Sequence, residues 1–355
     1  MDMHARHRHP RRHRMRWSRT TASVATAAVC SVAAAVLMAS CASNGPVTLT
    51  LYNGQHPQLT NAVVRAFEAQ AGIRVAVRTD DGVVLADELL QEGASSPADV
   101  YLTENSPELM MLSEHHLLAT LPASITDQIP NRYDSPTRNW VGVALRVSAL
   151  AYNPSLIHLA QLPTHLLQLA APRWKGKIAI APTDSDFVPL VGAVIATDGR
   201  RAALEWLRGL KANASLYQDD ESVVAAVDRG AVAVGIINQY YWFRLRLEQG
   251  ANKTHSRLYY FPDHDVGGIE NISGAAVLAS SHHRSDAEKL VAFLASAKAQ
   301  RILAQGDDYE YPARPGVAPN PALPPLSSVA PATVSVIKLG NDLPAASLLQ
   351  QVGLT

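Results

Sequence analysis

The sequence predicts an α/β protein whose body folds as two lobes. Apolar strands alternate with amphipathic helices from Val47 onward, and a similar alternation starts again after Val141. The 355 residues suffice for two domains. A content of 47% hydrophobic and 17% charged residues is typical of folded rather than disordered chains.

The first alternation covers residues 47–90. Apolar residues run through 47–52 and alternate over 73–77, as in strands, while helical spacing appears in 59–67 and 84–90. Strands joined by helices of this length form βαβ units, so we expect a parallel sheet.

The second alternation begins with a long apolar strand at 141–152. We expect further strands at 178–181, 231–237 and 275–279, and helices at 190–196, 202–210 and 286–303. Seven prolines between Pro312 and Pro331 allow extended connections but no regular helix or central strand.

The first 40 residues are strongly basic. They hold seven arginines and one acid, Asp2, and they end in an uncharged stretch rich in Ala and Val, an order typical of an export signal. The rest of the chain has 24 basic against 30 acidic residues, a net charge of −6. That balance argues against nucleic-acid binding.

The end of this signal, Leu37-Met38-Ala39-Ser40-Cys41, resembles the lipobox of bacterial lipoproteins, with Met38 where leucine is usual. The resemblance implies that residues 1–40 are removed and that Cys41 is lipidated, which anchors the body to the outer face of the cell membrane. A plain signal peptide and an uncleaved span are the alternatives, although a span needs about 20 apolar residues. Each of the three places the body outside the cytoplasm.

The body lacks the common signatures of catalysis. It contains no HExxH, Walker A, GxGxxG or GxSxG motif. Both cysteines lie within the first 41 residues, which excludes thiol chemistry from the body. We therefore expect a binding protein rather than an enzyme.

Four polar segments each lie where a strand ends and a loop or helix begins. Ligands of open α/β sheets bind at the carboxyl ends of strands, so we expect these segments to converge. The segments are Tyr52-Asn53-Gly54-Gln55-His56, residues 96–104, residues 181–187, and Ile237-Asn238-Gln239-Tyr240-Tyr241-Trp242.

The order and spacing of these segments resemble those of bacterial ferric-ion-binding proteins, the substrate-binding components of iron ABC importers. The resemblance covers almost all of the body, including residues 174–177, 273–278 and 309–312. It implies a type II periplasmic-binding-protein fold with a hinged cleft and a transferrin-like iron site. The iron-ligand positions of that family fall on His56, Glu104, Tyr240 and Tyr241.

The chemistry of these side chains supports a ferric ligand independently. A hard cation prefers oxygen anions and accepts imidazole. Free phenols, with a pKa of about 10, are neutral at working pH, but a bound cation can take them as phenolates. Two phenolates and Glu104 supply three negative charges, which balance one ferric ion and suit divalent ions less well.

Each of these residues also has a purely structural interpretation. A Tyr-Tyr pair after a strand is usually half core and half surface. His56 can begin or cap a helix at Pro57, and Glu104 can be a first-turn acid favoured by the helix dipole. Only the set, at the spacing of the family, indicates a metal site.

The expected anion pocket differs from that of family members that hold a synergistic phosphate. Small or neutral residues and asparagines are replaced here by Asp184, Ser185, Asp186 and Asp220, and only Asn238 keeps a neutral amide. Two unit charges about 4 Å apart repel by roughly 4 kcal/mol at an effective dielectric constant of about 20. We therefore predict that phosphate is not the partner anion.

Two substitutes for phosphate remain open. The carboxylate of Asp186 or Asp184 can fill the remaining iron position, or carbonate can dock on Arg146, where some relatives have an anion-anchoring arginine. The structural alternatives are an N-cap at Asp184 and a solvated loop at Asp219 and Asp220.

The resemblance also implies how the lobes work. We expect one lobe of residues 47–146 with 271–320 and another of 147–270 with 321–355, with iron bridging them and hinge closure around it. An ABC permease and ATPase are the implied partners, and the protein is expected to be a monomer.

Other functions remain open. One is the same fold binding an amine of the polyamine or thiamine type through its aspartates, although an amine needs no phenolate pair. A sensory ligand-binding module, or a lipoprotein enzyme that uses the same cleft, is another.

Overall fold

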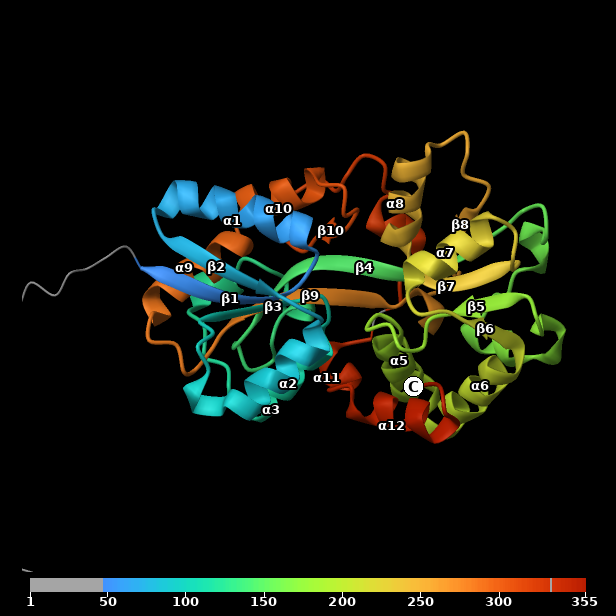
Figure 1. The fold of residues 1–355 in the computed structure, drawn as a ribbon, viewed down its shortest axis with the longest axis horizontal. Coiled ribbons are helices and arrows are strands. Elements are labelled where there is room, and N and C mark those ends of the chain that lie inside the picture. The colour runs from blue at the N-terminus through green and yellow to red at the C-terminus, as the bar shows by residue number, and fades with distance from the viewer. Residues whose placement is uncertain (1–46, 333) are drawn as a thin grey trace, which may run out of the picture. The chain divides into compact units, whose positions relative to one another are not determined.

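The computed structural model of the protein describes residues 47–332 and 334–355. Strands and helices alternate along these residues and build one mixed sheet of ten strands (Figure 1). The predicted α/β body is therefore confirmed. The export signal and Cys41 lie outside the described residues. Within the described part, no helix is long and apolar enough to cross a membrane.

The ten strands are ordered β2-β1-β3-β9-β4-β7-β5-β6, and β8 and β10 pair with β4. Their bounds are β1 (Thr48–Gly54), β2 (Arg74–Thr79), β3 (Val100–Thr103), β4 (Val141–Tyr152), β5 (Ile178–Ile180), β6 (Ala214–Leu216), β7 (Val234–Asn238), β8 (Arg257–Tyr259), β9 (Glu270–Val277) and β10 (Tyr311–Pro312).

Helices cover both faces of this sheet. They are α1 (Pro57–Ala71), α2 (Gly82–Glu92), α3 (Ser106–Glu114), α4 (Ala123–Thr126), α5 (Phe187–Asp198), α6 (Arg200–Asn213), α7 (Asp220–Asp228), α8 (Gln239–Gln249), α9 (Arg284–Leu294), α10 (Ala297–Gln305), α11 (Val336–Leu339) and α12 (Leu343–Val352). In Figure 1, α1, α9 and α10 lie on one face of β1 and β3, and α2 and α3 lie on the other.

Within each of the two strand–helix alternations the strands pair in parallel, as expected. The strands that join the two alternations are antiparallel to their neighbours, so the expectation of a wholly parallel sheet is wrong. β1 pairs in parallel with β2 and β3, and β5 pairs in parallel with β6 and β7. However, β9 runs antiparallel to β3 and β4, and β4 runs antiparallel to β7. Hydrophobic periodicity identifies a strand but not its direction, so these long returning strands could not be oriented from sequence.

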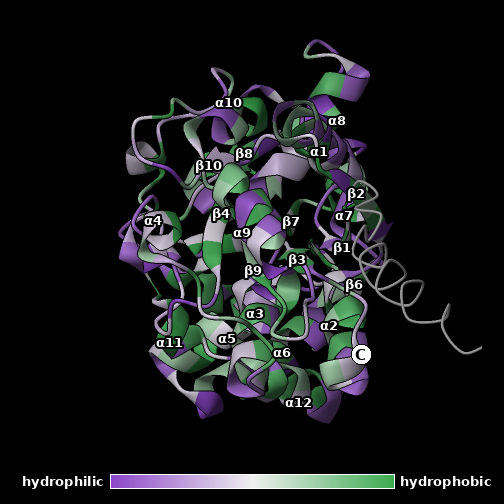
Figure 2. Cartoon of the chain, turned by 90° about the vertical axis from the view of Figure 1, so that its left-hand side faces the viewer, coloured by the Kyte–Doolittle hydropathy of each residue, from purple (hydrophilic) through white to green (hydrophobic). Residues whose placement is uncertain are grey.

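β4 is the strand that connects the two halves of the sheet. All twelve of its residues are buried, its first part pairs with β9, and its last five residues pair with β7. A strand covered on both faces is expected to be continuously apolar, as β4 is apart from Arg146 and Ser148. In Figure 2 the surrounding helices carry both hydrophobic and hydrophilic residues, as amphipathic helices do.

Two hydrophobic clusters form the core. One gathers β1, β3 and β9 with α1, α2 and α9, and the other gathers β5 with α5, α6 and α12. The first cluster also takes in residues 223–227 and 240–245, which we assigned to the second lobe. The division into lobes stays a prediction.

Several predicted elements differ in their bounds, and two of them differ most. The helix expected over 286–303 is interrupted between α9 and α10, where Ser296 caps α10 by accepting the Ala299 N–H at 3.3 Å. Both helices bury one face against the same core, so the apolar pattern continues across the break. β9 begins five residues earlier than expected. Its polar residues Asn271 and Ser273 are buried within the sheet, so the apolar pattern did not reveal this part of the strand.

Candidate metal centre

The four polar segments converge as expected. β1, β3, β5 and β7 end at Gly54, Thr103, Ile180 and Asn238, and within four residues they are followed by His56, Glu104, Asp184 and Tyr240. Hydrogen bonds from side chains connect the segments: Asn105 Nδ2 donates to the Ser185 carbonyl at 3.4 Å, and Tyr240 Oη donates to Asp186 Oδ2 at 3.1 Å.

A tight turn after β1 positions His56. Asn53 accepts the Gln55 N–H at 3.2 Å and donates to the Gln55 carbonyl at 2.7 Å. Gly54 lies so close to α2 that a Cβ there would be 2.6 Å from the Gly82 Cα. His56 precedes α1, but its side chain makes no capping hydrogen bond; it turns inward instead.

The His56 imidazole faces three carboxylates. Its Nδ1 lies 3.4 Å from Glu104 Oε1, 3.4 Å from Glu310 Oε1 and 3.9 Å from Asp308 Oδ1. Burial alone would lower the pKa of His56, but Glu104 and Glu310 outweigh burial and raise it to about 9. In the metal-free protein His56 is therefore a cation at neutral pH.

Glu104 lies in the link between β3 and α3, which begins only at Ser106. It is not a first-turn acid, so that alternative is wrong. Its Oε2 lies 3.5 Å from Arg146 Nη2. Burial raises the pKa of Glu104 to about 7, although His56 and Arg146 oppose the shift.

Tyr240 and Tyr241 form the first turn of α8 and are both buried, so they are not half surface. Their ring centroids are 4.0 Å apart, and the Tyr240 ring meets His56 edge-on at 5.0 Å. Burial and the negative charge of Asp186 raise the pKa of both phenols well above 10. Without a cation both are neutral.

Arg146 is the central cation of the cluster and is fully buried in β4. Its Nη2 donates to Asp186 Oδ1 at 2.7 Å and to Asn105 Oδ1 at 2.8 Å, and its Nε reaches the same Asp186 oxygen at 3.2 Å. Burial raises the pKa of Asp186 by itself, but the charge of Arg146 outweighs it and holds that pKa below its ordinary value. Asp186 is thus an ionised carboxylate between Arg146 and Tyr240.

Asp184 and Asp220 lie behind this carboxylate. Asp184 accepts the N–H groups of Asp186 and Asp220, both at 3.0 Å, and Asp220 accepts the Asn238 N–H at 3.1 Å. Burial and the charge of Asp186 raise the pKa of Asp184 to about 7, and burial and the charge of Asp184 raise that of Asp220 well above its ordinary value. The solvated loop proposed for Asp220 is therefore wrong, whereas Asp219 caps α7.

The remaining predicted pocket residues contribute differently. Asn238 is buried, and its Oδ1 accepts from Ser148 Oγ at 3.1 Å and from Asn271 Nδ2 at 3.2 Å. Ser185 joins the cluster through its carbonyl, which accepts from Asn105.

Sequence reasoning missed three members of the cluster: Asn105, Asp308 and Glu310. Asn105 is adjacent to Glu104 and holds Arg146. Glu310 lies in a segment that resembles the family. Its position between two tyrosines and before a proline was the one signal in the sequence that this acid is buried. It is 1% exposed.

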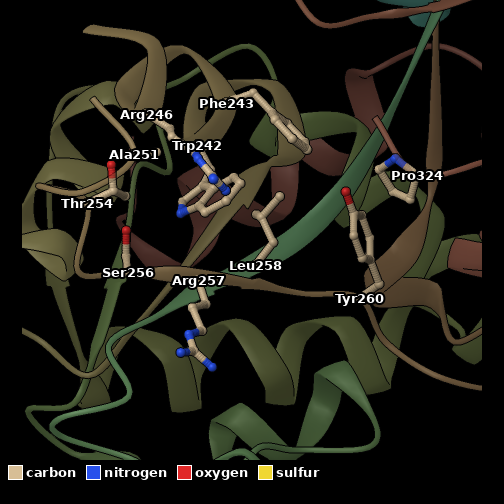
Figure 3. Close-up of a pocket in the computed structure, with 10 residues that line it drawn as sticks. All are labelled: Trp242, Phe243, Arg246, Ala251, Thr254, Ser256, Arg257, Leu258, Tyr260 and Pro324. Atoms are coloured by element: carbon tan, nitrogen blue, oxygen red, sulfur yellow. The ribbon is translucent and has the colours of Figure 1, made fainter. Parts of the chain in front are cut away.

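A hollow of about 460 Å³ lies beside the middle of α8 (Figure 3), and none of the predicted site residues line it. The Arg246 guanidinium lies 5.3 Å from the Trp242 ring centroid, whereas the Arg257 side chain points away from that ring. The two arginines therefore do not converge on one ligand. Among the described residues, no group of three or more His, Cys, Asp or Glu side chains is placed to hold a metal by itself, so a metal centre in the cluster would depend on the phenols.

Comparison with known sequences identifies similar proteins. A family model described as bacterial extracellular solute-binding protein matches residues 95–334. The Fe(3+)-binding periplasmic protein of Serratia marcescens is 37% identical over 306 residues, which are 86% of this chain and 90% of that protein. The major ferric iron-binding protein of Neisseria meningitidis serogroup B is 35% identical over 308 residues, 86% of this chain and 93% of that one.

Solved structures agree with these sequence matches. Iron-bound HitA from Pseudomonas aeruginosa is 40% identical, with a TM-score of 0.83 over 87% of this chain and 100% of that one. A Trichodesmium protein in complex with iron and citrate is 26% identical, with a TM-score of 0.74 over the same shares. The resemblance to ferric-ion-binding proteins and the periplasmic-binding-protein fold are confirmed, and these relatives are binding proteins rather than enzymes.

Proposed function

This chain belongs to the bacterial extracellular solute-binding proteins, and on that premise we propose that it captures ferric iron in a cleft between two lobes and delivers it to an ABC importer. His56, Glu104, Tyr240 and Tyr241 bind the metal. The lobes are residues 47–146 with 271–320 and 147–270 with 321–355, and they close around iron by a hinge motion.

The observation that carries the proposal is one buried cluster in which two phenols, an imidazole and carboxylates meet around Arg146. Tyr240 lies between His56, at 5.0 Å between ring centroids, and Asp186, at 3.1 Å. Phenolate, carboxylate and imidazole are donors that suit ferric iron. Iron must displace the phenol protons, which couples binding to pH.

Asp186 supplies the remaining negative ligand in place of an external anion. It is ionised, buried and already fixed beside Tyr240 by Arg146. Carbonate on Arg146 is the less favoured choice, because Asp186 and Asn105 already accept from Nε and Nη2, and among the described residues only Nη1 of that guanidinium is left without a hydrogen bond. Phosphate remains disfavoured, since the ionised carboxylate of Asp186 would repel it.

The cellular setting extends the proposal. Cys41 is lipidated and holds the protein at the outer face of the cell membrane, and a permease with a cytoplasmic ATPase receives the iron. The protein acts as a monomer. An amine ligand fits less well, because the aspartate nearest the phenols is already neutralised by Arg146.

A visible spectrum tests the proposal. Ferric citrate is added to the purified protein in phosphate-free buffer, and the expected result is a phenolate-to-iron absorption band that is lost or strongly reduced in Tyr240→Phe and Tyr241→Phe. Tyr217→Phe, which removes a phenol that is not among these residues, serves as the matched control and keeps the band. No band in the native protein, with or without added anions, would overturn the ferric function and favour an amine ligand.

A further inference from the structure

We propose that Glu310 is a positioning residue of the iron site, which accepts the Nδ1 hydrogen of His56 so that Nε2 is presented to the metal. This inference rests on the proposed function, because it assumes that His56 binds iron. It gives a role to the Tyr309-Glu310-Tyr311-Pro312 segment, which the ligand set leaves without one.

Two buried polar atoms face each other without a hydrogen-bond partner. They are His56 Nδ1 and Glu310 Oε1, they lie 3.4 Å apart, and neither has another hydrogen bond among the described residues. Buried donors and acceptors are nearly always paired. A movement of a few tenths of an ångström brings this pair to an ordinary hydrogen-bond distance.

The other contacts of Glu310 fix its orientation. Its Oε2 accepts from Gln55 Nε2 at 3.3 Å, while Gln55 Oε1 accepts the His56 N–H at 2.7 Å. Arg146 Nη1 lies 4.0 Å from Glu310 Oε1. Glu310 therefore holds both the imidazole and, through Gln55, the backbone of His56.

The loop that carries Glu310 is attached to the helix that carries the tyrosines. Tyr309 has φ +52°, a left-handed conformation that is rare for a bulky residue. Its carbonyl accepts from Gln239 Nε2 at 3.0 Å, and its ring stacks on Phe243 at 5.4 Å. α8 thus fixes both Tyr240 and the loop before Glu310, which sets the imidazole and the phenols relative to each other.

Two further carboxylates face the same nitrogen. Asp308 is too distant for a hydrogen bond, at 3.9 Å, and Glu104, at 3.4 Å, is itself a proposed metal ligand. When Glu104 binds the cation, Glu310 is the carboxylate left to accept the Nδ1 hydrogen. A metal-bound histidine generally donates its other N–H to such a carboxylate or carbonyl, which fixes the tautomer and the ring orientation.

The test compares Glu310→Gln and Glu310→Ala with the native protein. Iron affinity is measured in competition with citrate. Binding of His56 to iron is followed by the imidazole-nitrogen signal in electron spin-echo spectra of the ferric protein. Loss of such partners typically weakens metal binding 10- to 100-fold, so we expect about 10-fold for Gln, which keeps an acceptor oxygen, and about 100-fold for Ala. The phenolate band is expected to persist while the nitrogen signal broadens or disappears, as it disappears in His56→Ala.

Asp307→Asn is the matched control, because it removes one exposed negative charge from the same loop, and it is expected to leave affinity and nitrogen signal unchanged. Glu310→Gln keeps the shape of the side chain, so thermal melting is expected to show it folded even if the Ala variant is not. A folded Glu310→Gln protein with native affinity and nitrogen signal would overturn the positioning role. A native protein without a phenolate band would instead defeat the ferric function itself.

Discussion

The Tyr240 hydroxyl donates a 3.1 Å hydrogen bond to Oδ2 of Asp186. The other oxygen of that carboxylate, Oδ1, is held by Arg146 at 2.7 Å. One aspartate therefore links a proposed iron ligand to the only fully buried arginine among the described residues. A carboxylate fixed in this way can complete the coordination of iron without an added anion.

Removing this carboxylate is expected to make iron binding depend on an external anion. In buffer free of phosphate and carbonate, Asp186→Ala should lose the phenolate-to-iron band, because the site loses a negative ligand and Arg146 loses its partner. Added carbonate is expected to restore part of the band by occupying the space beside Arg146. The measurement is a titration with ferric ion, with and without bicarbonate.

Asp307→Asn, in an exposed loop position, is a suitable comparison for Asp186→Ala, since it also removes one acid. It should bind iron as the native protein does in both buffers. If the native protein itself requires added phosphate or carbonate for the band, Asp186 does not replace the anion.

Arg146 is expected to be essential for stability as well as for binding. Arg146→Met leaves Asp186 and Glu104 buried without their cation, and breaking a buried ion pair from one side costs about 3–5 kcal/mol. Urea denaturation of the metal-free protein should show this loss as a lower midpoint. Arg201→Met, which removes the exposed Arg201–Glu205 pair, should change the unfolding free energy by about 1 kcal/mol or less. Equal stability of the two variants would contradict the central role of Arg146.

Much of the fold could be predicted from sequence, because strand and helix periodicity are local. β4 has the predicted bounds, and the four polar segments follow strand ends, where a sheet brings distant residues together. Strand direction and the Ser296 cap inside a continuous apolar pattern depend on tertiary contacts or on a single side chain, so they were missed.

The residues of the candidate site were predictable only where they stood in a recognisable motif. Tyr240 and His56 did, and Arg146 was considered only as an anion anchor. Glu310 was missed because it lies in an irregular connection 255 residues from its hydrogen-bond partner Gln55, and no spacing rule reaches across such a distance. The burial of Asp220 was missed for a different reason: an acid after a polar loop usually lies in solvent.

The proposed lipid anchor depends on one side chain outside the described residues. Cys41→Ser is expected to abolish incorporation of labelled fatty acid and to move the protein from the membrane fraction to the soluble extracytoplasmic fraction, because the lipidated thiol is lost. Cys30→Ser, within the signal itself, should leave labelling unchanged. Undiminished labelling of Cys41→Ser would remove the lipoprotein prediction while leaving the iron site untested by this experiment.

Acidification is expected to release iron, and the shifted pKa values predict how steeply the iron affinity changes with pH. The phenols of Tyr240 and Tyr241 have pKa values above 10, and His56 has a pKa of about 9. Well below pH 9, iron must therefore displace about three protons, so the logarithm of the affinity should rise by about three for each pH unit. Below the Glu104 pKa of about 7, a fourth proton steepens the dependence.

The sign follows from the direction of these shifts. Tyr240, Tyr241 and His56 each carry a proton in the free protein that iron displaces, so protons compete with iron and the affinity falls as pH falls. Competition with citrate at pH 6, 7 and 8, corrected for the protonation of citrate and the hydrolysis of ferric ion, measures the slope. Tyr241→Phe removes one titrating phenol and should lower the slope by about one where binding is still measurable. An affinity that does not change between pH 6 and pH 8 would mean that iron displaces no protons, which is incompatible with phenolate ligands.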